Sequence, residues 1–291
     1  MNLYLLGTIL NISAIYMTAG AGSFLSIKGG NFNLGGEGQI YAGGFTAAVV
    51  LVALKDCPPV IALSAGFICA GLISAFLAFI PAVLKIYRNV DVLLSSFLIS
   101  AGCIPLIDSF VAGKFRGATN NLLATEFIPV SFRFSSILKP SSLNITFFAA
   151  LFICGLLYFL MTRTLFGHRL SVFGISSDFG IYSGYSEKKL VLVSVTVSGF
   201  LHGLAGFFCI AGTYFTCHSG FYSGMGWNAF SVSLIAQKNP LYLIPSAVVI
   251  SALTTCASQF SLMHNFGFDM GTLLQGVVLF AIVLGVRNRD K

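Results

Sequence analysis

The stretch Phe32-Asn33-Leu34-Gly35-Gly36-Glu37-Gly38-Gln39 places a carboxylate and amide groups among glycines, between two long apolar runs. Only 9% of the residues in the chain are charged. A charged side chain at the centre of a membrane costs about 2.5–3.5 kcal/mol on insertion scales, so an ionisable residue in such a segment is a candidate functional residue. Glu37 is therefore the first residue whose position needs an explanation.

The composition is that of an integral membrane protein. The 291 residues are 56% hydrophobic and have a mean hydropathy of +0.91, whereas soluble domains are about 45–50% apolar and about 25% charged. The apolar runs are long enough for helices that cross a hydrocarbon core about 30 Å thick. We expect an all-α, polytopic helix bundle of about eight to nine membrane segments, one of them short or broken, in a single domain over residues 1–291.

The predicted segments are 3–27, 35–54, 60–84, 92–111, 145–162, 190–210, 227–236, 241–257 and 270–286. The segment 227–236 is too short to cross alone, so we interpret it as a broken half-helix or a re-entrant piece covered by protein or by a water-filled cavity. It ends before Pro240, which disfavours helix at the residue that precedes it.

Basic residues near the segment ends orient the chain. The loop 163–190 and the C-terminal tail are rich in Lys and Arg, and such loops stay in the cytoplasm. Met1 then lies outside, and residues 113–144 form an outer surface loop with room for one short helix. We attribute the formal net charge of +7 to this orientation and not to nucleic-acid binding.

Several classes of function find no support in the sequence. The seven cysteines lack the paired spacing of a zinc site or a disulfide framework, and the four histidines lack a metal-ligand spacing. The chain has no phosphate-binding loop, because Lys114 is followed by Phe115 where that motif needs a hydroxyl group. No hydrolase motif is present either, so catalysis by this chain is not expected.

The stretch 32–39 has two interpretations. Its glycines allow close approach of a backbone or a ligand, and Asn33, Glu37 and Gln39 supply hydrogen-bonding groups. The stretch is either a kink on a translocation path or a buried polar clamp that joins helices and never meets a solute.

Two further groups of residues contain polar and aromatic side chains together. Residues 164–184 contain a Ser-Ser-Asp helix start, and we expect this segment to dock on a soluble partner in preference to lying on the bilayer surface. Residues 224–236 contain the only tryptophan; Trp227 and Asn228 could stack on and hydrogen-bond a ring, or Trp227 could be an interface anchor.

These three groups, in this order, resemble the membrane permease subunits of ATP-binding-cassette importers of the branched-chain amino acid, ribose and nucleoside type, closest to the nucleoside and riboflavin branch. The family phrase F-N-I-G-x-E-G-Q is matched by residues 32–39, with Leu34 in place of Ile. The phrases T-x-x-G-x-R-L-x-x-x-G, S-G-x-L-x-G-L-A-G and V-A-L-L-G-x-x-N-P are matched, the last in part, at 164–174, 198–206 and 232–240. The chain departs from the family at 179–181, where Phe-Gly-Ile replaces the usual Ala-Ala-Arg.

The resemblance implies a permease domain that binds no cofactor itself and is not an enzyme. It implies a second permease subunit, a paralogue on this branch, together with cytoplasmic ATPase subunits that hold ATP and Mg²⁺, and an extracytoplasmic solute-binding protein. It places the chain in the cell (inner) membrane, with a nucleoside or riboflavin favoured over a sugar or an amino acid as solute. The implied substrate path contains Asn33, Glu37, Gln39, Trp227 and Asn228, and the implied ATPase coupling surface within 163–190 contains Gly174, Ser176, Ser177, Asp178, Tyr182 and Gly184.

The main alternative is a self-sufficient secondary transporter in which Glu37 titrates and couples uptake to protons. A membrane enzyme ranks third, because no catalytic set is visible. ATP-driven uptake with a neighbouring ATPase would favour the importer, and uptake that follows a proton gradient would favour the secondary transporter.

Overall fold

The computed structural model describes residues 3–118, 122–236, 239–264 and 270–287. Its α-helices are α1 Leu3–Lys28, α2 Gly36–Ala53, α3 Pro59–Arg88, α4 Val92–Ala112, α5 Thr146–Arg163, α6 Leu165–Ile175, α7 Ser177–Tyr182, α8 Glu187–Cys209, α9 Met225–Ile235, α10 Leu243–Met263 and α11 Met270–Arg287. Short turns of other helix types occupy Val130–Phe132, Ile210–Tyr214 and Pro240–Tyr242. The described residues form no strand, only an isolated bridge between Ala124 and His218, so the predicted all-α bundle is confirmed.

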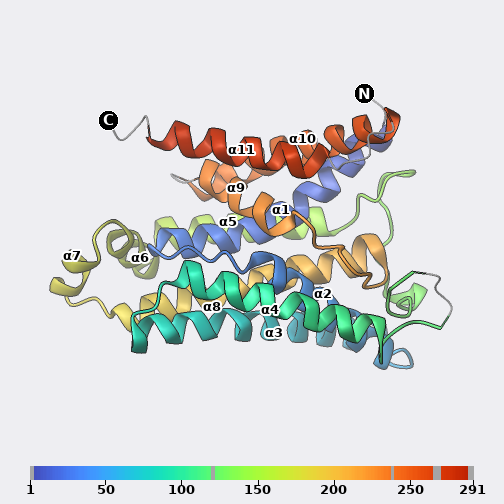
Figure 1. Cartoon of the computed structure of the whole chain (residues 1–291), viewed down its shortest axis with the longest axis horizontal. Helices are drawn as coiled ribbons and strands as arrows, with labels where there is room; N and C mark the ends of the chain where they lie inside the picture. Colours follow the sequence, from blue (N-terminus) through green and yellow to red (C-terminus); the bar gives the residue numbers. More distant parts are fainter. Residues whose placement is uncertain (1–2, 119–121, 237–238, 265–269, 288–291) are drawn as a thin grey trace.

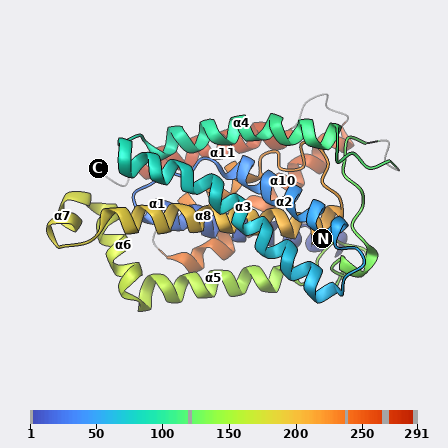
Figure 2. The same ribbon diagram turned by 90° about the horizontal axis from the view of Figure 1, so that it is seen from below.

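The long helices lie side by side along one axis (Figure 1). The described N-terminal residues and the C-terminal end of α11 lie at opposite ends of this axis, and α6 and α7 project at the end where α11 finishes. We call this the α6–α7 end. The view from below separates α4 and α5 to opposite edges, with α3 and α8 between them (Figure 2).

The core of the bundle is built on α1 and α8. In the most apolar window of each, 61% and 67% of the residues are buried, against 28–33% in α3, α4, α5 and α10. The outer helices therefore expose apolar surface that lipid or another protein chain must cover.

Glycines let α2 and α8 approach closely. A Cβ added to Gly43 would lie 2.5 Å from the Cα of Gly203, and one added to Gly206 would clash with the backbone of Ile40. Small residues at helix contacts are a common means of tight packing in membranes, where apolar burial drives association little.

Six of the described helical segments are long and apolar enough to span a membrane: Leu3–Lys28, Pro59–Arg88, Val92–Ala112, Thr146–Arg163, Glu187–Tyr214 and Pro240–Met263. The predicted number of eight to nine segments is therefore not confirmed. Two of the other predicted segments depart from a continuous span for visible reasons, since α2 begins with Glu37 and Gln39 and α9 has only 11 residues.

The segment 113–144 is more than the surface loop that the sequence predicts. Ile128, Phe132 and Asn144 are almost fully buried, and the backbone N–H of Ile128 donates to the carbonyl of Phe215 at 2.9 Å. The segment packs into the end of the bundle opposite α6 and α7 (Figure 1).

Candidate functional site

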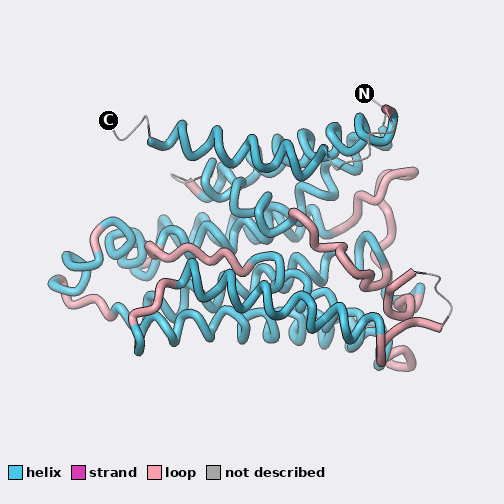
Figure 3. Tube along the Cα trace, viewed as in Figure 1, coloured by secondary structure: helices cyan, strands magenta, loops and turns pink. Residues whose placement is uncertain are grey.

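Two passes of this chain through the bundle, called crossings below, are each half extended and half helical. Residues 29–35 lead from the end of α1 to the start of α2, and residues 215–224 lead to the start of α9; Figure 3 shows both as loop segments that run along the bundle. Gly30 lies against Gly174 of α6, whereas Phe215 and Cys217 bond the loop at the opposite end. The two crossings therefore run in opposite directions, and the helical half of each begins near the middle of the bundle.

The starts of α2 and α9 meet there. The backbone N–H of Gly224 donates to Oε1 of Glu37 at 2.8 Å, and a Cβ on Gly226 would lie only 2.5 Å from the backbone nitrogen of Glu37. We call this contact, made by Gly36, Glu37 and residues 224–226, the α2–α9 junction. The short segment 227–236 is thus the helical half of a broken crossing, one of the two alternatives drawn from the sequence.

The chemistry of the junction follows from its two helix starts. The first turn of a helix has backbone N–H groups without helical partners and the positive end of the helix dipole, and both favour an anion. The Glu37 carboxylate, half-buried, supplies that negative charge between two such ends. Broken helices whose N-termini converge near the bilayer midplane are a recurring way to build a solute site in transport proteins.

Asn33 and Gln39 form a polar clamp with α8 and α1. Nδ2 of Asn33 donates to Oε1 of Gln39 and to Oγ of Ser198, each at 3.0 Å. Nδ1 of His202 lies 2.7 Å from the same Gln39 oxygen, and Nε2 of His202 lies 3.1 Å from Oγ of Ser23. With Nδ1 as the donor and Nε2 as the acceptor, every one of these contacts is satisfied.

The clamp favours the interpretation of Asn33 and Gln39 as groups that hold helices together. Both are almost fully buried and bonded to neighbours within the chain. His202 is accordingly a buried bundle histidine, as the sequence spacing indicates. Glu37 differs from the clamp residues, because it is half-buried and lies at the tip of α9.

Serines of neighbouring helices bond the irregular backbone beside the junction. The N–H groups of Leu34 and Gly38 donate to Oγ of Ser96 and Ser100 of α4, at 3.0 and 2.8 Å. Oγ of Ser74 in α3 donates to the carbonyl of Gln39 at 2.7 Å. Non-helical backbone at membrane depth requires such partners, so these bonds allow α2 to begin inside the bundle.

Trp227 and Asn228 lie at the junction. The Trp227 ring is half-buried beside Phe97 of α4, with ring centroids 6.5 Å apart. Nδ2 of Asn228 donates to the Tyr16 hydroxyl at 3.0 Å. Because α9 begins inside the bundle, this position favours a role of Trp227 near the junction over that of an interface anchor.

Asp108 of α4 is a second carboxylate that joins separate elements, half-buried near the end of α4, and the sequence analysis did not single it out. Its Oδ1 accepts hydrogen bonds from the hydroxyls of Tyr41 at 2.7 Å and Ser219 at 2.6 Å. It ties α2 and the extended segment 215–224 to α4. The rule that singled out Glu37, an ionisable residue in an apolar run, applies equally to Asp108.

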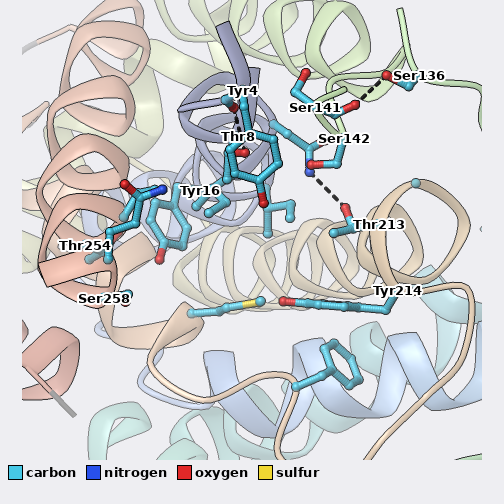
Figure 4. Close-up of a pocket in the computed structure, with 18 of the residues that line it drawn as sticks. Tyr4, Thr8, Tyr16, Ser136, Ser141, Ser142, Thr213, Tyr214, Thr254 and Ser258 are labelled. Atoms are coloured by element: carbon cyan, nitrogen blue, oxygen red, sulfur yellow. Dashed lines mark hydrogen bonds between the residues drawn. The ribbon is translucent and has the colours of Figure 1, made fainter. Parts of the chain in front are cut away.

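A cavity of about 800 Å³ lies between the first half of α1, the second half of α10 and the loop before α9. Hydroxyl-bearing residues approach it from different elements, among them Thr8 of α1, Ser141 of the loop 113–144 and Ser258 of α10 (Figure 4). Tyr16 and Met225 also line the cavity. Because Met225 follows Gly224 directly, the cavity reaches the α2–α9 junction.

The segment α6–α7 exposes apolar side chains at its own end of the bundle. Ser176 caps α7 by accepting from the N–H of Phe179, as expected of the Ser-Ser-Asp start, and Thr164 caps α6 by accepting from the N–H of Gly167. Ile175 is 89% and Tyr182 92% exposed. The predicted coupling residues Ser176, Ser177, Asp178, Tyr182 and Gly184 are all exposed and Gly174 is half-buried. Their role in coupling stays a prediction.

Gly174 attaches this segment to the bundle. A Cβ there would clash with the carbonyl of Lys28 and lie 3.0 Å from the nitrogen of Gly30. The α6–α7 segment therefore packs directly on the extended residues that lead to α2. Within the described part of the chain, no group of three or more His, Cys, Asp or Glu side chains could hold a metal ion.

The chain is similar to known transport proteins over nearly its whole length. Residues 5–284 match the family model described as branched-chain amino acid transport system / permease component. The chain is 29% identical over 274 residues to the probable riboflavin import permease protein RfuC of Treponema pallidum, covering 93% of this chain and 72% of that one. It is 24% identical over 255 residues to the guanosine ABC transporter permease protein NupP of Bacillus subtilis, covering 86% and 73%.

A third relative is the glucose ABC transporter permease protein TsgB13 of Haloferax volcanii, 25% identical over 282 residues, covering 91% of this chain and 72% of that one. Among solved structures, PsaBC from Streptococcus pneumoniae in complex with Fab aligns with a TM-score of 0.52 and 14% identity, covering 97% of this chain and 90% of that one. At that identity the likeness concerns the fold.

Proposed function

The chain belongs to the family of permease components of branched-chain amino acid transport systems, and from that premise we propose that it is the membrane-spanning subunit of an ATP-binding-cassette importer for a nucleoside or riboflavin. The observation that carries the proposal is the family match over residues 5–284. The resemblance drawn from the sequence motifs is thereby confirmed. The chain is a multi-pass protein of the cell (inner) membrane.

The proposed solute follows from the relatives. The names of the relatives include riboflavin, guanosine and glucose, and the riboflavin permease has the highest identity of these three. We favour riboflavin or a nucleoside over a sugar on this ground.

The proposed partners are a second permease subunit, cytoplasmic ATPase subunits that hold ATP and Mg²⁺, and an extracytoplasmic solute-binding protein. The exposed apolar side chains of α6 and α7 support an ATPase docking surface, because a large exposed apolar patch commonly marks a surface that a partner covers. Asp178 and Tyr182 are its central residues in this proposal.

The α2–α9 junction is the proposed barrier on the path. Gly174 packs on the residues that lead to α2, so a movement of α6 and α7 that ATP drives has a direct mechanical route to Glu37. In this proposal Glu37, Trp227 and Asn228 lie along the solute path, while Asn33 and Gln39 keep α2 fixed to α8 beside it.

The test is uptake into proteoliposomes that contain this chain with its neighbouring permease, ATPase and solute-binding protein. Radiolabelled riboflavin and guanosine are compared, with and without ATP on the ATPase side. Uptake that requires ATP supports the importer, and the accumulated label identifies the solute. Uptake of neither compound under any condition would contradict the proposed solute class.

A further inference from the structure

The cavity between α1, α10 and the loop before α9 has the position and the volume of a small-molecule binding site. It lies at the end of the bundle opposite α6 and α7, since the first residues of α1 and the last of α10 line it. In the proposed orientation that end faces away from the ATPase. Its volume of about 800 Å³ lies within the range of about 300–1,000 Å³ typical of small-molecule sites.

The lining combines aromatic rings with neutral hydrogen-bonding groups. Tyr16, Tyr214 and Phe221 contribute rings, and Asn11, Thr213 and many hydroxyl groups contribute polar atoms. No charged side chain is among the described residues that line it. A phosphate group would lose its hydration there without a counter-charge, whereas a neutral solute would lose much less.

One polar group in this wall has no partner. Thr255 lines the cavity and is only 7% exposed, and its Oγ1 has no hydrogen-bond partner among the residues that the structure describes. A buried hydroxyl left without a partner is costly, so a small movement of the Thr255 side chain that brings this hydroxyl to the cavity surface would let a solute there supply the missing hydrogen bond.

The backbone beside the cavity has an irregular conformation. Residues Ile210–Tyr214 form a π-turn after α8, a feature frequent at functional sites. The next residue, Phe215, has a φ angle of 62°, which is rare for an aromatic residue. Nδ2 of Asn11 donates to Oγ1 of Thr213 at 2.9 Å and fixes the turn against α1.

We propose that this cavity is a solute-binding chamber within this one chain, selective for an uncharged compound that joins a planar ring system to a hydroxylated chain or sugar, and closed to the phosphorylated forms of such compounds. The rings of Tyr16 and Tyr214 stack on or border the planar part, and Thr255 bonds it. This inference rests on the proposed function for the direction of transport, but the binding itself needs no ATP.

The experiment measures binding to the complex of this chain with its second permease and ATPase, without the solute-binding protein. Quenching of riboflavin fluorescence reports binding, and guanosine, riboflavin 5′-phosphate, guanosine 5′-phosphate and glucose serve as competitors. We expect riboflavin and guanosine to bind, and the two phosphates and glucose to bind at least tenfold more weakly. Equal binding of a phosphate and its parent compound would overturn the proposal.

Two buried hydroxyls that lack partners among the described residues give a matched pair of variants. Thr255→Val keeps the shape of the side chain and removes the hydroxyl, and we expect binding about three- to tenfold weaker, the effect of one lost hydrogen bond. Thr196→Val makes the same change in α8, where Thr196 Oγ1 also lacks a partner but does not line the cavity. We expect it to bind riboflavin as the unaltered chain does.

The failures of the two proposals are distinguishable. Identical riboflavin binding and uptake by the Thr255→Val and unaltered chains, with uptake dependent on ATP, would overturn the chamber and leave the importer standing. Riboflavin binding that Thr255→Val weakens, without ATP-dependent uptake, would support the chamber and contradict the importer.

Discussion

Glu37 and Asp108 show how single carboxylates are accommodated inside this bundle. Glu37 accepts from a backbone N–H at the start of α9, and Asp108 accepts from two hydroxyls. A charge in a low-dielectric environment persists only with such donors. Each carboxylate is therefore also a link between chain segments that are far apart in sequence.

Removal of the Asp108 carboxylate should destabilise the chain. Asp108→Ala leaves the part-buried hydroxyl of Tyr41 without its acceptor, whereas the exposed Ser219 can bond water instead. We expect the free energy of unfolding to fall by about 1–2 kcal/mol. Thermal unfolding of the purified chain in one detergent measures the difference. Asp56→Ala, at an exposed position, is the control and should remain within about 0.5 kcal/mol of the unaltered chain.

The two carboxylates also show what residue-level reading of the sequence can find. Glu37 was predicted because glycines and amides surround it, whereas Asp108 is a single charged residue late in an apolar run. The bonds of Asp108 come from residues 67 and 111 positions away in the chain. The local sequence contains no sign of these partners. The carboxylate within an apolar run was nevertheless enough to mark Asp108 as a candidate functional residue.

Among the elements, the meeting of α2 and α9 depends on glycine. A methyl group at Gly226 would lie 2.5 Å from the nitrogen and 2.7 Å from Cγ of Glu37, and backbone cannot yield as a flexible side chain can. We expect Gly226→Ala to lower the free energy of unfolding by about 1–3 kcal/mol. Gly155→Ala in α5 has no neighbouring atom within 4 Å and should be neutral or stabilising by up to about 1 kcal/mol.

Thermal unfolding of both glycine variants in the same detergent provides the comparison. Equal midpoints for Gly226→Ala and Gly155→Ala would mean that the helix starts do not meet as described.

The exposed tip of α7 should matter for coupling and not for folding. Tyr182 is 92% exposed, so Tyr182→Ala should leave the free energy of unfolding within about 0.5 kcal/mol. Loss of an aromatic anchor from an interface commonly costs about 2 kcal/mol or more, a roughly thirtyfold loss of affinity. Co-purification of the ATPase and the rate of uptake measure the effect.

Val60→Ala is the matched control for Tyr182→Ala. Val60 is 76% exposed next to the start of α3, at the opposite end of the bundle. A decrease in ATPase co-purification that is as large for Val60→Ala as for Tyr182→Ala would count against the docking surface.

The topology of the whole molecule agrees with the charge distribution of the sequence. The α6–α7 segment and the end of α11 lie at one end, and the described N-terminal residues lie at the other (Figure 1). We expect a membrane-impermeant thiol reagent to label Tyr182→Cys only from the cytoplasmic side and Leu122→Cys only from outside. Both substitutions are made with the cysteines that are not buried replaced by serine, namely Cys57, Cys69, Cys103 and Cys256.

Labelling of both engineered cysteines from the same side would contradict this topology. Labelling of each from the side opposite to the expected one would reverse the orientation of the chain.

At this scale the order and extent of most segments were predictable, because a helix that crosses a membrane must be a long apolar run. The broken crossings were less so. The extended residues 29–35 and 215–224 are stabilised by hydroxyl and backbone groups of other elements, such as the hydroxyls of Ser96 and Thr125. The cavity was not predicted, since residues from α1, α10 and the loop 113–144 form it together.

The most direct test of the central claim, that ATP drives transport past the α2–α9 junction, compares uptake of riboflavin by the unaltered chain and by Glu37→Gln under two driving forces. Proteoliposomes with the full set of subunits receive either ATP or a proton gradient. We predict uptake with ATP alone and retention of most of that rate in Glu37→Gln, because the glutamine oxygen can still accept from the N–H of Gly224. Uptake that follows the proton gradient without ATP and disappears in Glu37→Gln would contradict the claim and identify Glu37 as a proton carrier.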